Sequence, residues 1–453
     1  MKLVKMSLVA AMVMGASAFA LENVKISGDA KVFYNTNDAD TLNTAGTAVV
    51  NSNDLFDQGS SAADTALRLG VTGDLLKGVS FGVTGMAVST LGLENNLVSN
   101  TWTGAHDVGN GVNDKMWLSE AWIAATLGKT TAKIGRMELD TPLAFSEKWS
   151  VAANTFDAAV LINQDIPDTT LVGAWVGKGN GVNHGMGLTV TPTNDFGYDN
   201  IPAVGIDGIV GSGATFGTFG DKGAYAVAVV NNSFKPLTAQ AWYYNVVNVA
   251  DAYWLQADID CSLVKGLKIG AQYANIDPKG DLDTIVNSLG QTANDSSAYA
   301  AKVAYEGVPN LKVSAAYSDT DNDGVLNIAN TATNNLRGAQ SKLYTEAWWN
   351  YGYVGAPGAE SWNVTAEYDA GFAKFGAYFT DVSIGTTNAV SAYLATNKVG
   401  SKAANTDMTE VAVTASKSFG PLDATLAYVS TDADDQNLGS QYNSVQAYLT
   451  LNF

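Results

Sequence analysis

The final segment of the chain, residues 445–453, constrains the fold more than any other, because apolar and polar side chains alternate along it. Side chains in a β-strand point to opposite faces in turn, so a period of two separates the two kinds of residue. One face then carries Val445, Ala447, Leu449, Leu451 and Phe453, and the other carries Gln446, Tyr448, Thr450 and Asn452. Such a strand is typical of a soluble antiparallel sheet with one face exposed to solvent, or of a membrane barrel with lipid outside and water inside.

The other end of the chain has the pattern of a secretory signal. Lys2 and Lys5 precede an apolar run, 8–14, which small residues follow as far as Ala20. A basic start, a short apolar core and an A-x-A site predict a cleaved signal peptide over residues 1–20. Residues 21–453 would then form one mature domain without an apolar run long enough for a membrane helix. A mature chain that lies in a membrane must therefore cross it as a closed barrel, since only helices and closed barrels satisfy their backbone in lipid.

Segments with the same alternation recur along the chain and predict an all-β, antiparallel transmembrane barrel of about 18 strands, within a range of about 16–18. The connections between them alternate in length. Short turns are expected at 74–78, 128–130, 264–266, 307–309 and 419–421, and long insertions at about 36–63, 89–116, 138–155, 177–223, 276–296, 319–358 and 383–406. Short periplasmic turns and long extracellular loops are typical of outer-membrane barrels. Aromatic residues near the expected strand ends, such as Trp122, Trp254 and Trp348-Trp349, suit an interfacial girdle.

The charge and the rare residues exclude several classes of function. A net charge of −19 argues against a nucleic-acid partner and favours the attraction of cations. The one cysteine, Cys261, cannot form an internal disulfide. The two histidines, His106 and His184, fall in expected loops without a nucleophile motif, so we expect no enzyme and no zinc site.

One acidic segment has part of a calcium-loop pattern. Asp319, Asp321 and Asp323 place carboxylates at alternate positions before Gly324. The twelfth position would be Asn330 instead of glutamate, and no helices are expected on either side. Loop Ca²⁺ is the one cofactor that the sequence suggests, and a solvated acidic loop is the alternative.

Several segments resemble known families of outer-membrane protein. The terminal strand, which ends at Phe453, resembles that of bacterial outer-membrane barrels, whose last Phe is read by the barrel assembly machinery. The start 1–5 and the hairpin 297–305 resemble campylobacterial major outer-membrane protein porins, and 135–142 with 154–156 is similar to the third-loop region of OprD-type porins. The resemblance implies an 18-stranded barrel with its third loop folded into the lumen. It also implies a homotrimer in the bacterial outer membrane, in contact with lipid and lipopolysaccharide.

The same resemblance implies a pore constriction in which an acidic loop faces a basic wall. The matching acidic residues are Glu138, Asp140 and Glu147, and the basic ones are Lys31, Arg68, Lys133, Arg136 and Lys148. Alternation places Arg136 on the lipid side with Ile134, so Arg136 either lies above the membrane or is turned inward by a bulge. With Arg68, Arg136 and Arg337 as its three arginines, the chain lacks the arginine ladder of carboxylate-specific OprD-type channels.

These observations predict a water-filled porin for the passive diffusion of ions and small hydrophilic solutes. The carboxylate excess predicts a preference for cations, because acidic groups along a narrow lumen favour them. The alternative is a β-rich adhesin or surface protein, secreted or anchored in the outer membrane, without channel activity.

Overall fold

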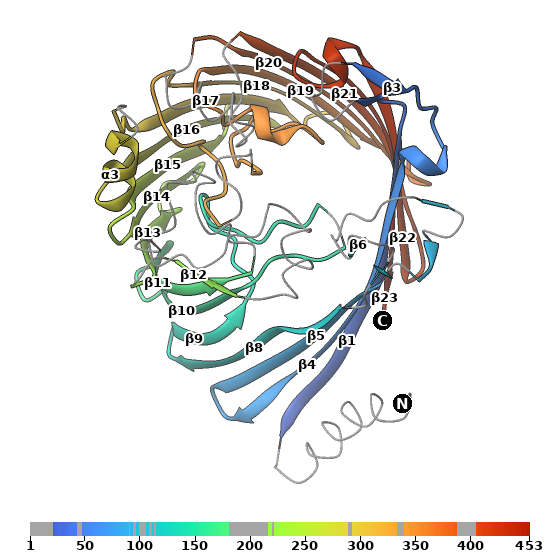
Figure 1. Cartoon of the computed structure of the whole chain (residues 1–453). Coiled ribbons are helices and arrows are strands. Elements are labelled where there is room, and N and C mark those ends of the chain that lie inside the picture. Colours follow the sequence, from blue (N-terminus) through green and yellow to red (C-terminus); the bar gives the residue numbers. More distant parts are fainter. Residues whose placement is uncertain are drawn as a thin grey trace.

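A computed structural model describes residues 21–42, 48–89, 91–93, 97–98, 106–107, 111–112, 115–149, 151–180, 216–219, 222–288, 292–332, 339–386 and 405–453. Within these residues, 18 strands close into one antiparallel barrel, which Figure 1 shows as a ring. They are β1 (Glu22–Asn37), β4 (Ser61–Leu76), β5 (Val79–Ser89), β8 (Lys115–Leu127), β9 (Thr130–Met137), β10 (Phe156–Asn163), β11 (Thr169–Gly179), β13 (Ala224–Asn231), β14 (Leu237–Val246), β15 (Ala250–Asp260), β16 (Leu267–Pro278), β17 (Ser296–Tyr305), β18 (Leu311–Thr320), β19 (Ala359–Asp369), β20 (Lys374–Ile384), β21 (Thr406–Phe419), β22 (Leu422–Ala433) and β23 (Tyr442–Asn452). The predicted all-β barrel is confirmed.

The remaining elements are short and lie in the connections between barrel strands. They are β2 (Thr41–Leu42), β3 (Val49–Asn51), β6 (His106–Asp107), β7 (Gly111–Val112), β12 (Gly217–Thr218), α3 (Asp281–Ser288), η1 (Gln58–Ser60), η3 (Tyr351–Tyr353) and η4 (Asn437–Gly439). None of the helices in the described residues has the length and apolar character that a membrane crossing requires.

The first and last strands close the barrel. β1 pairs with β4 on one side and with β23 on the other, and its register with β23 runs from Asp29 opposite Asn452 to Asn37 opposite Ser444. The last residue continues this ladder, because the Phe453 amide donates to the Gly28 carbonyl at 3.0 Å and the Gly28 amide donates to the Phe453 carbonyl at 2.8 Å. Closure leaves the barrel without an unpaired edge strand.

The alternation predicted for the last strand separates the outside of the barrel from its lumen. Leu449 and Leu451 are 38% and 42% exposed, whereas Gln446 on the other face is 0% exposed. The same outward exposure of large apolar side chains recurs around the wall, at Ile26, Leu67, Ile134, Leu161, Val227, Leu255, Ile269, Val303, Val364, Val411 and Leu426. A continuous apolar outer face is what a barrel needs in order to lie in hydrocarbon.

The two ends of the barrel differ in the length of their connections. At one end, called the turn end here, Lys77-Gly78 joins β4 to β5 and Gly420-Pro421 joins β21 to β22. Gly78 has φ +80°, a left-handed conformation that glycine adopts without strain. The expected short turns all lie at this end and the expected long insertions lie at the other, the loop end. The sequence did not predict that two loop-end connections, 247–249 and 434–441, are short.

Two long connections from the loop end occupy the middle of the barrel. They are loop three (138–155), which joins β9 to β10, and loop seven (321–358), which joins β18 to β19. In Figure 1 the teal trace of loop three and the orange trace of loop seven lie inside the ring of strands. The inward fold of the third loop is as predicted. Loop seven inside the lumen was not predicted.

Candidate pore constriction

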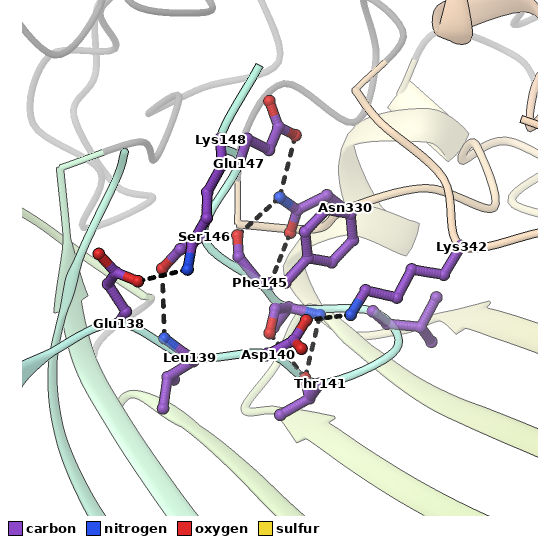
Figure 2. Close-up of polar contacts among 12 residues, drawn as sticks. Glu138, Leu139, Asp140, Thr141, Phe145, Ser146, Glu147, Lys148, Asn330 and Lys342 are labelled. Atoms are coloured by element: carbon purple, nitrogen blue, oxygen red, sulfur yellow. Dashed lines mark hydrogen bonds and ion pairs between the residues drawn. The ribbon is translucent and has the colours of Figure 1, made fainter. Parts of the chain in front are cut away.

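Loop three is a compact hairpin held by its own backbone. Asp140 forms an isolated β-bridge with Phe145, and the Ser146 amide donates to the Leu139 carbonyl at 2.8 Å. At the tip, the Thr141 hydroxyl donates to the Ala144 carbonyl at 2.7 Å. These contacts hold the backbone of loop three in one path, and Figure 2 shows the acidic side chains that the loop carries.

Asn330 of loop seven joins the two loops at the centre of the barrel. The Phe145 amide donates to Asn330 Oδ1 at 3.1 Å, and Asn330 Nδ2 donates to the Phe145 carbonyl at 2.9 Å. The same Nδ2 also donates to Glu147 Oε1 at 3.0 Å, and Asn330 is 0% exposed. A buried amide whose oxygen and nitrogen both have partners fixes one arrangement of the loops, since any other leaves polar groups unpaired.

A lysine of loop seven pairs with an acidic residue of loop three. Lys342 Nζ forms an ion pair with Asp140, and it lies 4.7 Å from the centre of the Phe145 ring. The Asp140 side chain is 86% exposed, so this pair faces water (Figure 2). The contact places a cation beside the most accessible of the three acidic residues that the sequence assigned to the constriction.

Another of the acidic candidates, Glu138 at the start of loop three, lies against the barrel wall. Lys148 Nζ is 2.6 Å from Glu138 Oε2, and Arg68 Nη1 of β4 is 3.3 Å from Glu138 Oε1. Arg68 Nε is also 2.7 Å from Asp29 Oδ2 of β1. Lys31 follows Asp29 by two residues on β1 and therefore shares its inward face. The structure thus brings the predicted acidic loop residue and the predicted basic wall residue into direct contact.

The other two basic candidates have different positions. Lys133 points inward and lies 4.1 Å from the centre of the Trp122 ring. Arg136 stays on the outward face with Ile134, where its Nε and Nη2 donate to the two carboxylate oxygens of Asp157 at 2.7 and 3.1 Å. No bulge therefore turns Arg136 into the lumen. The third arginine, Arg337, lies outside the described residues.

The three acidic candidates therefore have three different environments. Glu138 is paired with the wall, Asp140 is exposed beside Lys342, and Glu147 is 7% exposed within the contact between the loops. Both Asn330 Nδ2 and the Gln340 amide donate to Glu147 Oε1, at 3.0 and 3.3 Å. Glu147 can hold the loops together, but its carboxylate faces protein and not the water of the lumen.

Loop seven is fastened to the wall by a buried glutamate that the sequence did not single out. Glu410 of β21 is 1% exposed and accepts hydrogen bonds from the Trp349 amide at 3.0 Å and from the Asn350 amide and Asn350 Nδ2, both at 2.8 Å. A buried acceptor with several donors is satisfied without water. Because the donors come from the loop backbone, Glu410 fixes the path of the loop as well as one side chain.

An aromatic cluster completes the attachment of the loops to the wall. The Phe33 ring lies 6.4 Å from Trp149 of loop three, 6.1 Å from Trp349 of loop seven and 4.7 Å from Tyr448 of β23, between ring centres. Trp349 therefore lies in the lumen and not in an interfacial girdle. Trp254, another residue assigned to the girdle, is 0% exposed.

Two carboxylates of the calcium-loop pattern have hydrogen-bond partners in the part of the chain that is described, and loop Ca²⁺ stays a prediction. The Tyr299 hydroxyl donates to Asp319 Oδ2 at 2.8 Å, and Asn294 Nδ2 donates to Asp323 Oδ2 at 3.1 Å. Among the described side chains, no three His, Cys, Asp or Glu residues are placed to hold a metal ion. His184 and the side chain of His106 lie outside the description.

Several solved proteins of Pseudomonas aeruginosa are similar to this chain in fold. Pseudomonas aeruginosa OccK9 (OpdG) superposes with a TM-score of 0.67 at 13% identity, covering 95% of this chain and 99% of the other. OpdK from the same organism, solved with vanillate, has a TM-score of 0.66 at 12% identity over 95% and 98% of the two chains. OccK8 (OprE) has a TM-score of 0.65 at 14% identity, with coverage of 95% and 98%.

At these identities the likeness is one of fold. No protein-family model matches the chain, and no curated protein matches it. The neighbours support the OprD-like barrel, and the resemblance to campylobacterial porins stays a prediction.

Proposed function

We propose that the protein is a porin of the bacterial outer membrane, through which ions and small hydrophilic solutes pass by diffusion. The observation that carries this proposal is a closed barrel with an apolar outer face and a lumen narrowed by two polar loops. Full-length similarity in fold to Pseudomonas outer-membrane channels supports it. Export through a signal peptide, recognition of Phe453 by the assembly machinery, contact with lipopolysaccharide and a homotrimer belong to the same proposal.

The preference among ions is proposed to be for cations and to be weak. Around loop three, Asp29, Glu138 and Asp140 lie beside Arg68, Lys148 and Lys342, so the charges of the two signs nearly balance. The excess negative charge, −19 in total, must then lie on other loops and lumen residues. Salt screens charges that are farther from the constriction than a Debye length of about 8 Å. One OprD-type channel is known with vanillate, but this chain's three arginines favour a less selective pore.

The test is the reversal potential of the purified protein in a planar bilayer under a salt gradient. We expect stepwise conductance with a small potential of the sign that indicates cation preference. Stepwise conductance with anion preference would keep the porin and refute the cation preference. An absence of conductance from folded barrels would refute the channel and favour a surface protein such as an adhesin.

A further inference from the structure

Two glutamates of different loops are close enough for the charge of one to affect the other, in the region where loop seven packs against loop three and the wall. Glu147 belongs to loop three and is held by Asn330 and the Gln340 amide of loop seven. Glu346 belongs to loop seven and is held through its backbone, because its amide donates to the Leu343 carbonyl at 3.2 Å and Asn363 Nδ2 of β19 donates to its carbonyl at 3.3 Å. The backbone of Glu346 is therefore fixed between the loop and the wall.

The backbone of Glu346 has hydrogen-bond partners, whereas one oxygen of its carboxyl group has none. Its Oε1 is buried and accepts no hydrogen bond from any residue in the described part of the chain. An ionised carboxylate with one buried oxygen that has no partner is costly, whereas the neutral acid is tolerated. Burial is the larger cause and repulsion by Glu147 the smaller one, and together they raise the pKa of Glu346 to about 8.

The other groups that face Glu346 do not cancel this effect. Lys342 favours the ionised form, but its Nζ is engaged with Asp140. A hydrogen bond from the Ser341 backbone also favours the ionised form of Glu346, but burial and Glu147 outweigh it. Burial and the two glutamates hold the pKa of Tyr351 well above its ordinary value, so this tyrosine stays neutral.

We propose that the contact between loop three and loop seven depends on a proton held by Glu346, and that the two loops separate more often once that proton is lost. The charged Glu346 and Glu147 would repel each other across a buried interface, and separation lets water reach both. Separated loops obstruct less of the lumen, so each separation is a step to higher conductance. The inference rests on the proposed function, since it concerns the regulation of the same constriction.

The direction of the pH dependence follows from the two pKa values of Glu346. In the closed contact the value is about 8, and in the separated loops it returns towards the ordinary 4.5. The closed contact therefore holds its proton more tightly than the separated loops do. Its stability is greatest below pH 4.5, declines as the pH rises towards 8, and changes little above that. The ratio of separated to closed loops should rise by up to about tenfold per pH unit within this window.

The experiment is single-channel recording of the full protein from pH 5 to pH 9, with the dwell times in the higher and lower conductance levels measured at each pH. We expect the ratio of dwell times to rise with pH and to level off above pH 8. In Glu346→Gln the ratio should not change with pH, because an uncharged amide replaces the group that titrates. In Glu147→Gln, loss of the repelling charge should move the levelling-off to lower pH.

The controls separate this inference from the proposed function. Glu360→Gln removes an exposed glutamate at the loop end and should leave the pH dependence intact. A wild-type ratio that does not change with pH would overturn the inference. A Glu346→Gln variant that keeps the pH dependence would overturn it as well, since another group would then be the one that titrates. Both results would leave a conducting porin, whereas no conductance at any pH would refute the porin itself. Heat-modified migration on a gel verifies that each variant is folded.

Discussion

At the scale of single residues, the charges around loop three work in pairs and not as a set of free carboxylates. Glu138 is paired with Arg68 and Lys148, and Asp140 with Lys342. The removal of one partner therefore changes the local field mainly through the charge that is left behind. The buried Glu147 is different, because it faces protein and not the lumen.

The first prediction concerns ion selectivity. The double variant Glu138→Gln with Asp140→Asn leaves Arg68, Lys148 and Lys342 without their anionic partners. We expect the reversal potential in a salt gradient to move towards anion preference, since fixed basic side chains in the lumen attract anions. Glu147→Gln alone should leave the potential unchanged at pH 7. A shift from Glu147→Gln as large as that of the double variant would show that the Glu147 carboxylate faces the lumen and is not buried between the loops.

The sequence predicted part of this cluster and missed the rest for a physical reason. Glu138, Arg68 and Lys148 could be proposed because the loop-three segment resembles a known one and Arg68 lies on an alternating strand. Asn330 and Lys342 contact loop three across separations of 185 and 202 residues. They come from a loop without periodicity, and no local pattern indicates which distant segment such a loop will meet.

At the scale of elements, loop seven is the feature that most distinguishes this lumen from the prediction. The strands were predictable because each buries or exposes every second residue, which leaves a pattern in the sequence. The residues Trp348-Trp349 were assigned to an interfacial girdle, and a tryptophan in a girdle or in a packed lumen gives the same sequence signal. The contact of Trp349 with Phe33 and Glu410 decides between the two positions.

The second prediction tests the attachment of loop seven. Glu410→Ala leaves the Trp349 and Asn350 donors without their buried acceptor, at about 1–3 kcal/mol for each unsatisfied group. We expect loop seven to leave the wall, so that the single-channel conductance rises and its fluctuations increase, while the barrel remains folded on a gel without heating. Glu306→Ala, in a turn-end connection far from the loops, serves as the control and should conduct like the wild type. Unchanged conductance in folded Glu410→Ala barrels would show that other contacts suffice to hold the loop.

At the scale of the whole molecule, closure of the barrel depends on close packing where the two ends of the chain meet. A Cβ atom added to Gly28 would lie 2.4 Å from the Arg68 carbonyl oxygen and 2.7 Å from a ring carbon of Phe453. Gly28 also exchanges both backbone hydrogen bonds with Phe453, so the added atom would clash on both sides of β1, with β4 and with the residue that follows β23. The sequence showed that the last strand alternates, but it could not show which residue of the first strand lies against its end.

The last prediction follows from this seam. Gly28→Ala forces β1 away from the Arg68 carbonyl of β4 and also crowds the ring of Phe453, and both changes weaken the ladders that β1 forms with its two neighbours. We expect the temperature at which the folded form converts to the unfolded form on a gel to fall by several degrees, since overpacking costs about 1–3 kcal/mol. Gly173→Ala is the matched control, because Gly173 also lies in a strand but a Cβ there meets nothing within 4 Å. This control should keep the wild-type temperature, or exceed it slightly because alanine restricts the unfolded chain. Equal temperatures for all three proteins would mean that the ends of β1 and β23 adjust without cost and that closure does not depend on Gly28.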